Sequence, residues 1–167
     1  PPAQLESGRN KMELSQHLSF TVDPENRADY VTMFALAGQE QFRPLPNGKS
    51  TFGFSRGTYW FHARLFNKDS FDERWLLVLQ YPLLDEINVY LRYPDGRVEF
   101  MSSGDSMPFS SRAIRYRMPN FWVSLPQRTE VELLVSARSK SSMQVPLALY
   151  TPASFAEMER DAQFGIG

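Results

Sequence analysis

The sequence predicts an all-β fold, an antiparallel β-sandwich or jelly roll, on three observations. From residue 57 onward, apolar and polar residues alternate with a period of two, as in strands that bury one face. About eight such runs follow one another, separated by clusters of Gly, Pro, Ser and Asn and without helical patterns between them. Aromatic residues make up 14% of the chain, which favours β structure or a stacking surface.

The elements can be placed in order along the chain. A first strand is expected around residues 17–22. Segment 23–36 should form one or two helical turns, with Asp23 as N-cap and Pro24 at the first helical position. The run "GTYWFHARLF" at 57–66 is the clearest strand. Further strands are expected at 74–81, 86–93, 96–102, 113–118, 120–125, 130–137 and 144–150.

The turns and ends complete this layout. Pro94-Asp95-Gly96 predicts a hairpin turn, whereas the polar, unpatterned residues 1–13 are expected to be a flexible lead-in to a sandwich over 14–152. Ser154 and Glu157 have the S-x-x-E spacing of a capping box, so residues 153–167 should contain a short helix. That helix is either a solvated terminal helix or a connector to a segment after Gly167.

Composition limits the classes of function. The 167 residues suffice for one domain with a real core. With 18 Lys and Arg against 19 Asp and Glu, no overall field attracts nucleic acid, so no nucleic-acid partner is expected. The absence of Cys excludes a thiol nucleophile, a disulfide framework and a Cys-ligated metal. No apolar run approaches the roughly 18 residues that cross a bilayer.

A candidate binding face follows from the alternation in 57–66. Tyr59 and Phe61 should enter the sandwich, which leaves Trp60, His62 and Arg64 together on the opposite face. An exposed indole offers a flat apolar platform, and the neighbouring cations can bind hydroxyls or carboxylates. We therefore expect these three side chains to form a binding surface on an open sheet.

The strand at 113–118 has a similar alternation. Ile114 and Tyr116 should point into the sandwich, while Arg115 and Arg117 point outward. These arginines are either solvated residues on an outer face or, if their strand shares a face with Trp60, part of the same site. Arg117 is therefore included as a candidate ligand-binding residue.

Patterns associated with catalysis are weak. "GFSRG" at 53–57 matches G-x-S-x-G, but a nucleophile elbow needs a helix after the serine, and a strand is expected after Ser55. The acidic pairs Asp72-Glu73 and Asp85-Glu86 are adjacent in sequence, so each pair would point to opposite faces of a strand and not across a cleft. No catalytic residue is expected.

Metal binding has little support. His17 and His62 are the only histidines, and they lack the spacing of a zinc site. A calcium site built from the loop carboxylates Asp69, Asp72 and Asp95 is an alternative that the sequence leaves open. No other cofactor is expected.

The order and spacing of several motifs resemble a known family. The motifs are Tyr59-Trp60-x3-Arg64-x2-Asn67, Trp75, "YPLLDEINVY" at 81–90, Gly104-Asp105, "PF" at 108–109 and Arg112. From about residue 14 to the C-terminus the chain resembles the type-2 extracellular sensor domain that precedes the membrane helices of bacterial seven-transmembrane receptors with diverse intracellular signalling modules. No single motif is as specific as a metal-ligand quartet.

The resemblance implies a jelly roll similar to carbohydrate-binding modules, located in the periplasm. It also implies attachment to the inner membrane by a transmembrane region after Gly167, as the sensor of a hybrid histidine kinase. The implied ligand is carbohydrate-like, and a homodimer is expected. Alternatives are a dimerisation module, with aromatics such as Trp122 or Tyr90 at its interface, and a free-standing carbohydrate-binding module.

The resemblance also carries over individual residues. Those that match the family's motifs and are candidates for the ligand site are Trp60, Arg64, Asn67, Asp85, Asp105 and Arg112. Some of them are expected to support the fold instead of touching ligand. Asp105 and Arg112, for example, could form an internal ion pair that fixes the loop after Gly104.

Overall fold

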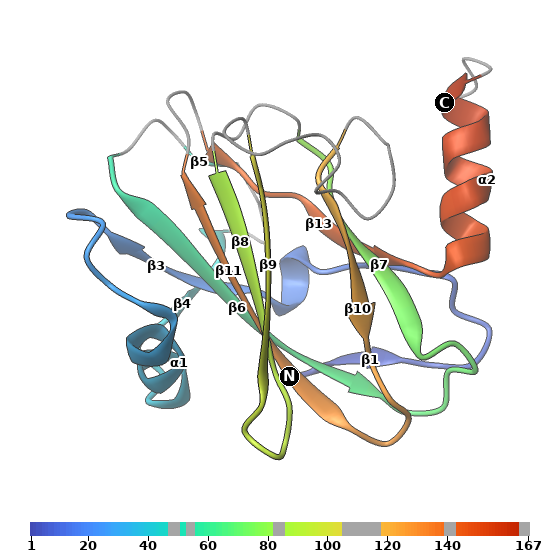
Figure 1. The fold of residues 1–167 in the computed structure, drawn as a ribbon, viewed down its shortest axis with the longest axis horizontal. Helices are drawn as coiled ribbons and strands as arrows, with labels where there is room; N and C mark the ends of the chain where they lie inside the picture. The colour runs from blue at the N-terminus through green and yellow to red at the C-terminus, as the bar shows by residue number, and fades with distance from the viewer. Residues whose placement is uncertain (47–50, 53–55, 82–85, 105–117, 139–142, 164–167) are drawn as a thin grey trace.

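The computed structural model describes residues 1–46, 51–52, 56–81, 86–104, 118–138 and 143–163. Two β-sheets face each other across a shared core, and one helix lies against the outer side of each sheet (Figure 1). The predicted all-β jelly-roll sandwich with a short C-terminal helix is confirmed.

The larger sheet contains the long strand at the centre of the prediction. Its strand order is β4 (Arg43–Pro44), β3 (Ser19–Asp23), β6 (Thr58–Asn67), β11 (Glu130–Arg138), β8 (Glu86–Arg92) and β9 (Val98–Gly104). Neighbours along this path are antiparallel, and β1 (Ala3–Leu5) adds a parallel pairing to the end of β6. The central strands therefore come from distant parts of the chain, as in a jelly roll.

The smaller sheet closes the other side of the core. Its order is β10 (Asn120–Ser124), β7 (Arg74–Leu79), β13 (Leu147–Tyr150) and β2 (Lys11–Glu13). A separate two-stranded ribbon pairs β12 (Met143–Gln144) with β5 (Thr51–Phe52). A 3-10 turn, η1 (Ser15–His17), links the two sheets by connecting β2 to β3.

Alternation decides which side chains enter the core. In β6, Tyr59, Phe61, Ala63 and Leu65 are buried between the sheets, as predicted. Trp75 of β7 is fully buried against them, and its indole nitrogen donates to the carbonyl of Asp72 at 3.0 Å. The predicted hairpin turn at 94–96 also joins β8 to β9, with Gly96 at φ +90°.

The expected flexible lead-in at 1–13 is instead part of both sheets. Ala3 and Leu5 of β1 are buried against the end of β6, and Met12 of β2 is buried beside β13. These strands have three residues each, too few to show a period of two in the sequence. Their place at sheet edges is a tertiary effect that local patterns do not record.

Helix α1 (Tyr30–Gly38) starts later than expected. Asp29, not Asp23, is the N-cap, and its Oδ1 accepts the Thr32 N–H at 2.9 Å. Asp23 ends β3, and its carboxylate accepts the Ala28 N–H at 2.7 Å, which holds the connection from β3 to α1. The helix lies on the outer face of the larger sheet, opposite the main core.

Helix α2 (Pro152–Gln163) begins two residues before the predicted capping box. Pro152 occupies the first helical position, and Thr151 Oγ1 accepts the Ser154 N–H at 3.3 Å. Phe155 is buried against Tyr150 on the outer face of the smaller sheet. Neither helix in the described ranges is long and apolar enough to cross a membrane.

Candidate functional site

The outer face of the larger sheet carries three rows of side chains. Directly paired residues on neighbouring strands point to the same face, so the register defines each row. The amide row contains Trp60, Ser136, Asn88 and Ser102. The aromatic row contains His62, Leu134, Tyr90 and Phe100. The charged row contains Arg64, Glu132, Arg92 and Val98.

Trp60 lies on the predicted face but not in the predicted environment. The expectation of an exposed indole is wrong, because Trp60 is only 4% exposed. Helix α1 lies over it, and Met33 and Phe34 of the helix form a small apolar core with Trp60 and Leu134. Alternation assigned the face correctly, but it cannot show that a helix covers it.

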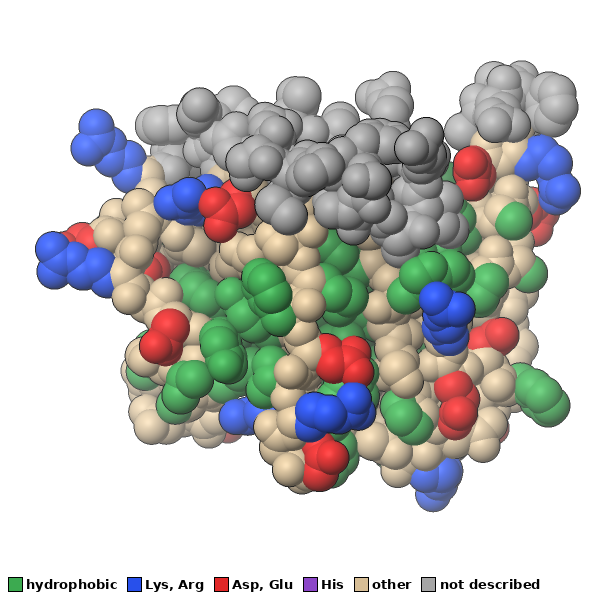
Figure 2. Space-filling model, in the orientation of Figure 1, with side chains coloured by type: hydrophobic (Ala, Val, Ile, Leu, Met, Phe, Trp, Pro, Cys, Tyr) green, Lys and Arg blue, Asp and Glu red, His purple; other side chains and the backbone are tan. Residues whose placement is uncertain are grey.

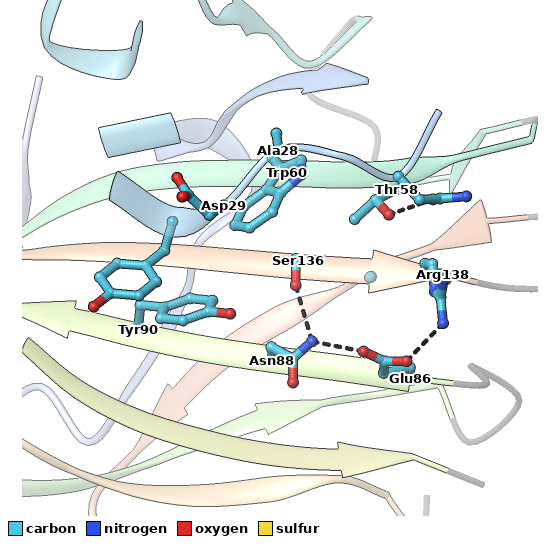
Figure 3. Close-up of a pocket in the computed structure, with 12 residues that line it drawn as sticks. Ala28, Asp29, Thr58, Trp60, Glu86, Asn88, Tyr90, Ser136 and Arg138 are labelled. Atoms are coloured by element: carbon cyan, nitrogen blue, oxygen red, sulfur yellow. Dashed lines mark hydrogen bonds and ion pairs between the residues drawn. The ribbon is translucent and has the colours of Figure 1, made fainter. Parts of the chain in front are cut away.

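A cavity of about 310 Å³ opens beside the start of α1, and we call it the trough (Figure 3). Three aromatic rings form its apolar side. The rings of Tyr30 and Tyr90 are stacked with centroids 4.9 Å apart, and the Trp60 ring lies 6.0 Å from Tyr90 at 26°. Tyr30 comes from α1 and Tyr90 from β8, so the trough lies between the helix and the sheet.

Hydrogen-bonding side chains line the opposite side of the trough (Figure 3). Asn88 Nδ2 donates to Ser136 Oγ at 3.2 Å and to Glu86 Oε1 at 3.0 Å. The second oxygen of Glu86 accepts from Arg138 at 2.8 Å. The hydrogen bond from Asn88 lowers the pKa of Glu86, and the nearby Arg138 adds to this against the opposing effect of burial. The carboxylate is thus ionised and paired.

The indole nitrogen of Trp60 is a buried hydrogen-bond donor. Among the described residues, Trp60 Nε1 has no hydrogen-bond acceptor, although Trp60 lines the trough. Figure 3 places this nitrogen on the side of the ring near Thr58, whose hydroxyl donates to Asn26 at 2.6 Å. Buried N–H groups are almost always paired, and an unpaired one costs about 1–3 kcal/mol. Because this nitrogen has almost no accessible surface, a ligand oxygen in the trough could pair with it only if neighbouring side chains move to open it.

His62, at the β6 end of the aromatic row, interacts with the charged row instead of the trough. Its Nε2 lies 3.0 Å from Glu132 Oε1, and Arg92 Nε donates to the other Glu132 oxygen at 2.7 Å. We call His62, Glu132 and Arg92 the Glu132 cluster. Burial opposes ionisation of Glu132, but hydrogen bonds from His62 and Arg92 outweigh it and lower the pKa of the carboxyl. Arg92 also lies 4.3 Å from the centre of the Phe34 ring.

His62 and Arg64 line a second cavity, of about 270 Å³, together with His17 and Ser19. The structure therefore does not bring the three predicted side chains of β6 to one site. Trp60 faces the trough, whereas His62 and Arg64 face the second cavity.

A model of the family described as 7TMR-DISM extracellular 2 matches residues 15–151. The chain belongs to this family. The matched range runs from η1 to the end of β13 and so includes both sides of the trough. Membership makes the chain an extracytoplasmic sensor domain, a class that is typically non-catalytic. No curated protein matches the chain.

The other predicted residues of this 7TMR-DISM domain fall into two groups. Asn67 is 1% exposed, and its amide donates to the Leu125 carbonyl at 2.8 Å and accepts the Ser70 N–H at 2.8 Å. It therefore holds loops together, and it does not line the trough. Outside the described residues lie Asp85, Asp105, Arg112 and Arg117, with the expected Asp105–Arg112 ion pair, and also Ser55, which was not expected to be catalytic.

The described part of the 7TMR-DISM domain contains no group of three or more His, Asp or Glu side chains placed to hold a metal ion. Of the suggested calcium ligands, Asp69 accepts the Ser7 N–H at 2.8 Å and Asp95 accepts the Arg97 N–H at 3.0 Å. These carboxylates stabilise separate loops.

Sequence reasoning missed several residues that line the trough. Asn88 and Tyr90 share a face in the run at 86–93, and the alternation used for Trp60 could have placed them there. Ser136 is the direct partner of both Trp60 and Asn88, but only the strand register reveals this. Tyr30 gave no signal, because its role depends on how α1 lies on the sheet.

Proposed function

We propose that this domain is the periplasmic ligand-sensing part of a membrane-bound hybrid sensor kinase and that it binds a carbohydrate-like ligand in the trough. The observation that carries the proposal is the Trp60 indole N–H, which has no partner among the described residues and lies beside stacked aromatic rings and a row of amide and hydroxyl groups. Membership in an extracellular sensor family supports the sensing role.

The chemistry of the trough suits a neutral sugar. The ring of Tyr30, which is 37% exposed, can stack on the apolar face of a pyranose ring, while Asn88 and Ser136 can exchange hydrogen bonds with its hydroxyls. Glu86 and Arg138 are paired with each other, so neither presents an uncompensated charge to the ligand. We expect an affinity between about 1 mM and 1 μM, or roughly −4 to −8 kcal/mol.

Sensing would work by a shift in populations. A ligand changes the balance between two receptor arrangements only by the difference in its affinity for them. In this proposal the arrangements differ in the placement of α2 relative to an inner-membrane region that follows Gly167. The fold contributes a rigid body that joins the ligand-binding face to that helix.

The test is a calorimetric titration of the domain against a panel of neutral mono- and oligosaccharides. Trp60→Phe removes the indole donor and keeps an aromatic ring, and it should weaken binding about tenfold through loss of one hydrogen bond of about 1.4 kcal/mol. The matched control is Trp122→Phe, on the smaller sheet beside Arg74, which should bind like the wild type. A folded wild type without saturable binding, or equal affinities for wild type and Trp60→Phe, would contradict the proposal.

A dimerisation module is the second candidate, favoured by one exposed side chain. Phe71, in the connection between β6 and β7, is 95% exposed. An apolar ring so exposed is suited to contact with a second copy of the domain. If so, Phe71→Ala should weaken a dimer measured by sedimentation equilibrium; a wild type that stays monomeric would exclude this role for the isolated domain.

A further inference from the structure

We infer that the ligand is an extended chain of sugar units and that Phe100 on β9 is a second stacking platform for it, outside the trough. This inference rests on the proposed function and deepens it, because it names the ligand class and adds a binding residue.

Phe100 has an unusual environment for a strand residue. It is 58% exposed, and it lies directly opposite Tyr90, with the two ring centroids 5.1 Å apart and tilted by 39°. In the aromatic row its ring therefore follows Tyr90 toward the last described strand of the sheet, while the Trp60 ring lies on the other side of Tyr90. Figure 2 shows hydrophobic side chains gathered at the surface between α1 and β9.

The polar groups follow the same direction. Ser102 on β9 lies opposite Asn88, and its hydroxyl donates to Asn88 Oδ1 at 2.8 Å. Hydroxyl and amide groups therefore run from the trough to β9, beside the aromatic rings. The two rows together suit a sugar chain, because every sugar unit presents an apolar ring face to aromatic rings and a hydroxyl edge to polar side chains.

The length of the face sets the size of the ligand. Three strand spacings separate β6 from β9, which corresponds to about 14 Å at about 4.8 Å per spacing. Neither Phe100 nor Ser102 lines the trough. Tyr90 lines the trough and its ring centre is 5.1 Å from that of Phe100, so a sugar unit joined to one held in the trough would lie against Phe100.

Exposure on an edge strand also needs a reason. Among the strands that the structure describes, β9 is the last in its sheet, and exposed apolar side chains such as Phe100 promote unwanted association. A stacking role supplies a reason for retaining an aromatic ring at this position.

The experiment compares affinities along oligosaccharide series of one to six units, in the neutral glucose, mannose and N-acetylglucosamine series. For the wild type, we expect a step of about three- to tenfold in affinity at the length that first reaches Phe100, the range given by one aromatic contact. Phe100→Ala should remove this step and leave the affinity for the shortest ligands unchanged, and Phe100→Trp should restore it. Phe71→Ala, the matched control at another exposed phenylalanine, should keep the step.

Two results would overturn this inference alone: binding without any step in affinity with length, or a step that persists in Phe100→Ala. A third, in which Phe100→Ala abolishes a dimer and leaves the length dependence intact, would assign Phe100 to self-association. Failure of every series to bind the folded wild type would overturn the proposed function as well, so the two failures are distinguishable.

Discussion

Replacement of Asn67 by Ala should strongly destabilise the domain without a direct effect on the trough. The side chain is buried and joins three backbone groups, the carbonyls of Leu125 and Asp72 and the N–H of Ser70. The Asp72 carbonyl keeps a second donor, the indole of Trp75, so Asn67→Ala leaves two groups unpaired. At about 1–3 kcal/mol for each, the free energy of unfolding should fall by about 2–6 kcal/mol.

Urea denaturation followed by fluorescence and circular dichroism measures this loss. The midpoint should fall while the slope stays constant, because the surface exposed on unfolding is nearly unchanged. For a domain of this size the loss corresponds to about 4 to 24 °C in melting temperature. It is a large share of the roughly 5–15 kcal/mol that stabilises a typical domain.

The same substitution at Asn88 is the matched control. Asn88 is half-buried at the trough, so water can replace its partners, and we expect Asn88→Ala to cost less than about 1 kcal/mol while it weakens ligand binding. The reasoning fails if Asn67→Ala unfolds within about 1 kcal/mol of the wild type, or if it loses ligand affinity while it keeps full stability.

Three further predictions concern other parts of the fold. Hydrogen bonds in the Glu132 cluster outweigh burial and lower the pKa of Glu132, so the stability of the domain should fall as the pH falls through the range below 4.5. Urea midpoints measured over a pH series should decline less steeply in Glu132→Gln than in the wild type. Gly57→Ala should lower the melting temperature far more than Gly96→Ala. Both glycines have positive φ, but an added Cβ at residue 57 would lie 2.7 Å from a Cα atom of the β3–α1 connection, whereas one at residue 96 would meet open space. Equal losses in thermal melts would contradict this. Thr151→Ala should cost about 1 kcal/mol and speed amide exchange in the first turn of α2, whereas unchanged exchange would mean that Thr151 does not cap it.

Local sequence patterns predicted which face of a strand is buried and where a tight turn occurs. The period of two in β6 separated Tyr59 and Phe61 from Trp60 correctly, because one face of that strand enters the core. The hairpin at Gly96 was also predicted from a local signal, because a tight turn needs a residue that accepts positive φ. Neither prediction depended on distant contacts.

The candidate site required information that local patterns lack. Whether Trp60 is covered depends on how α1 lies on the sheet, and the start of α1 was misplaced because two aspartates, Asp23 and Asp29, both precede plausible first turns. The trough also needs the register that places Ser136 between Trp60 and Asn88. Such pairings are set by tertiary packing, and a sequence alone gives no direct measure of them.

The position of α2 has a mechanical consequence. This helix is anchored through Phe155 to the smaller sheet, whereas the trough lies on the far side of the larger one. Between them is an interior of interlocked aliphatic and aromatic side chains, and such interiors are as dense as organic crystals and scarcely compressible. Ligand binding in the trough would then affect α2 by rotating or shifting the sandwich as a whole, and not by deforming its interior.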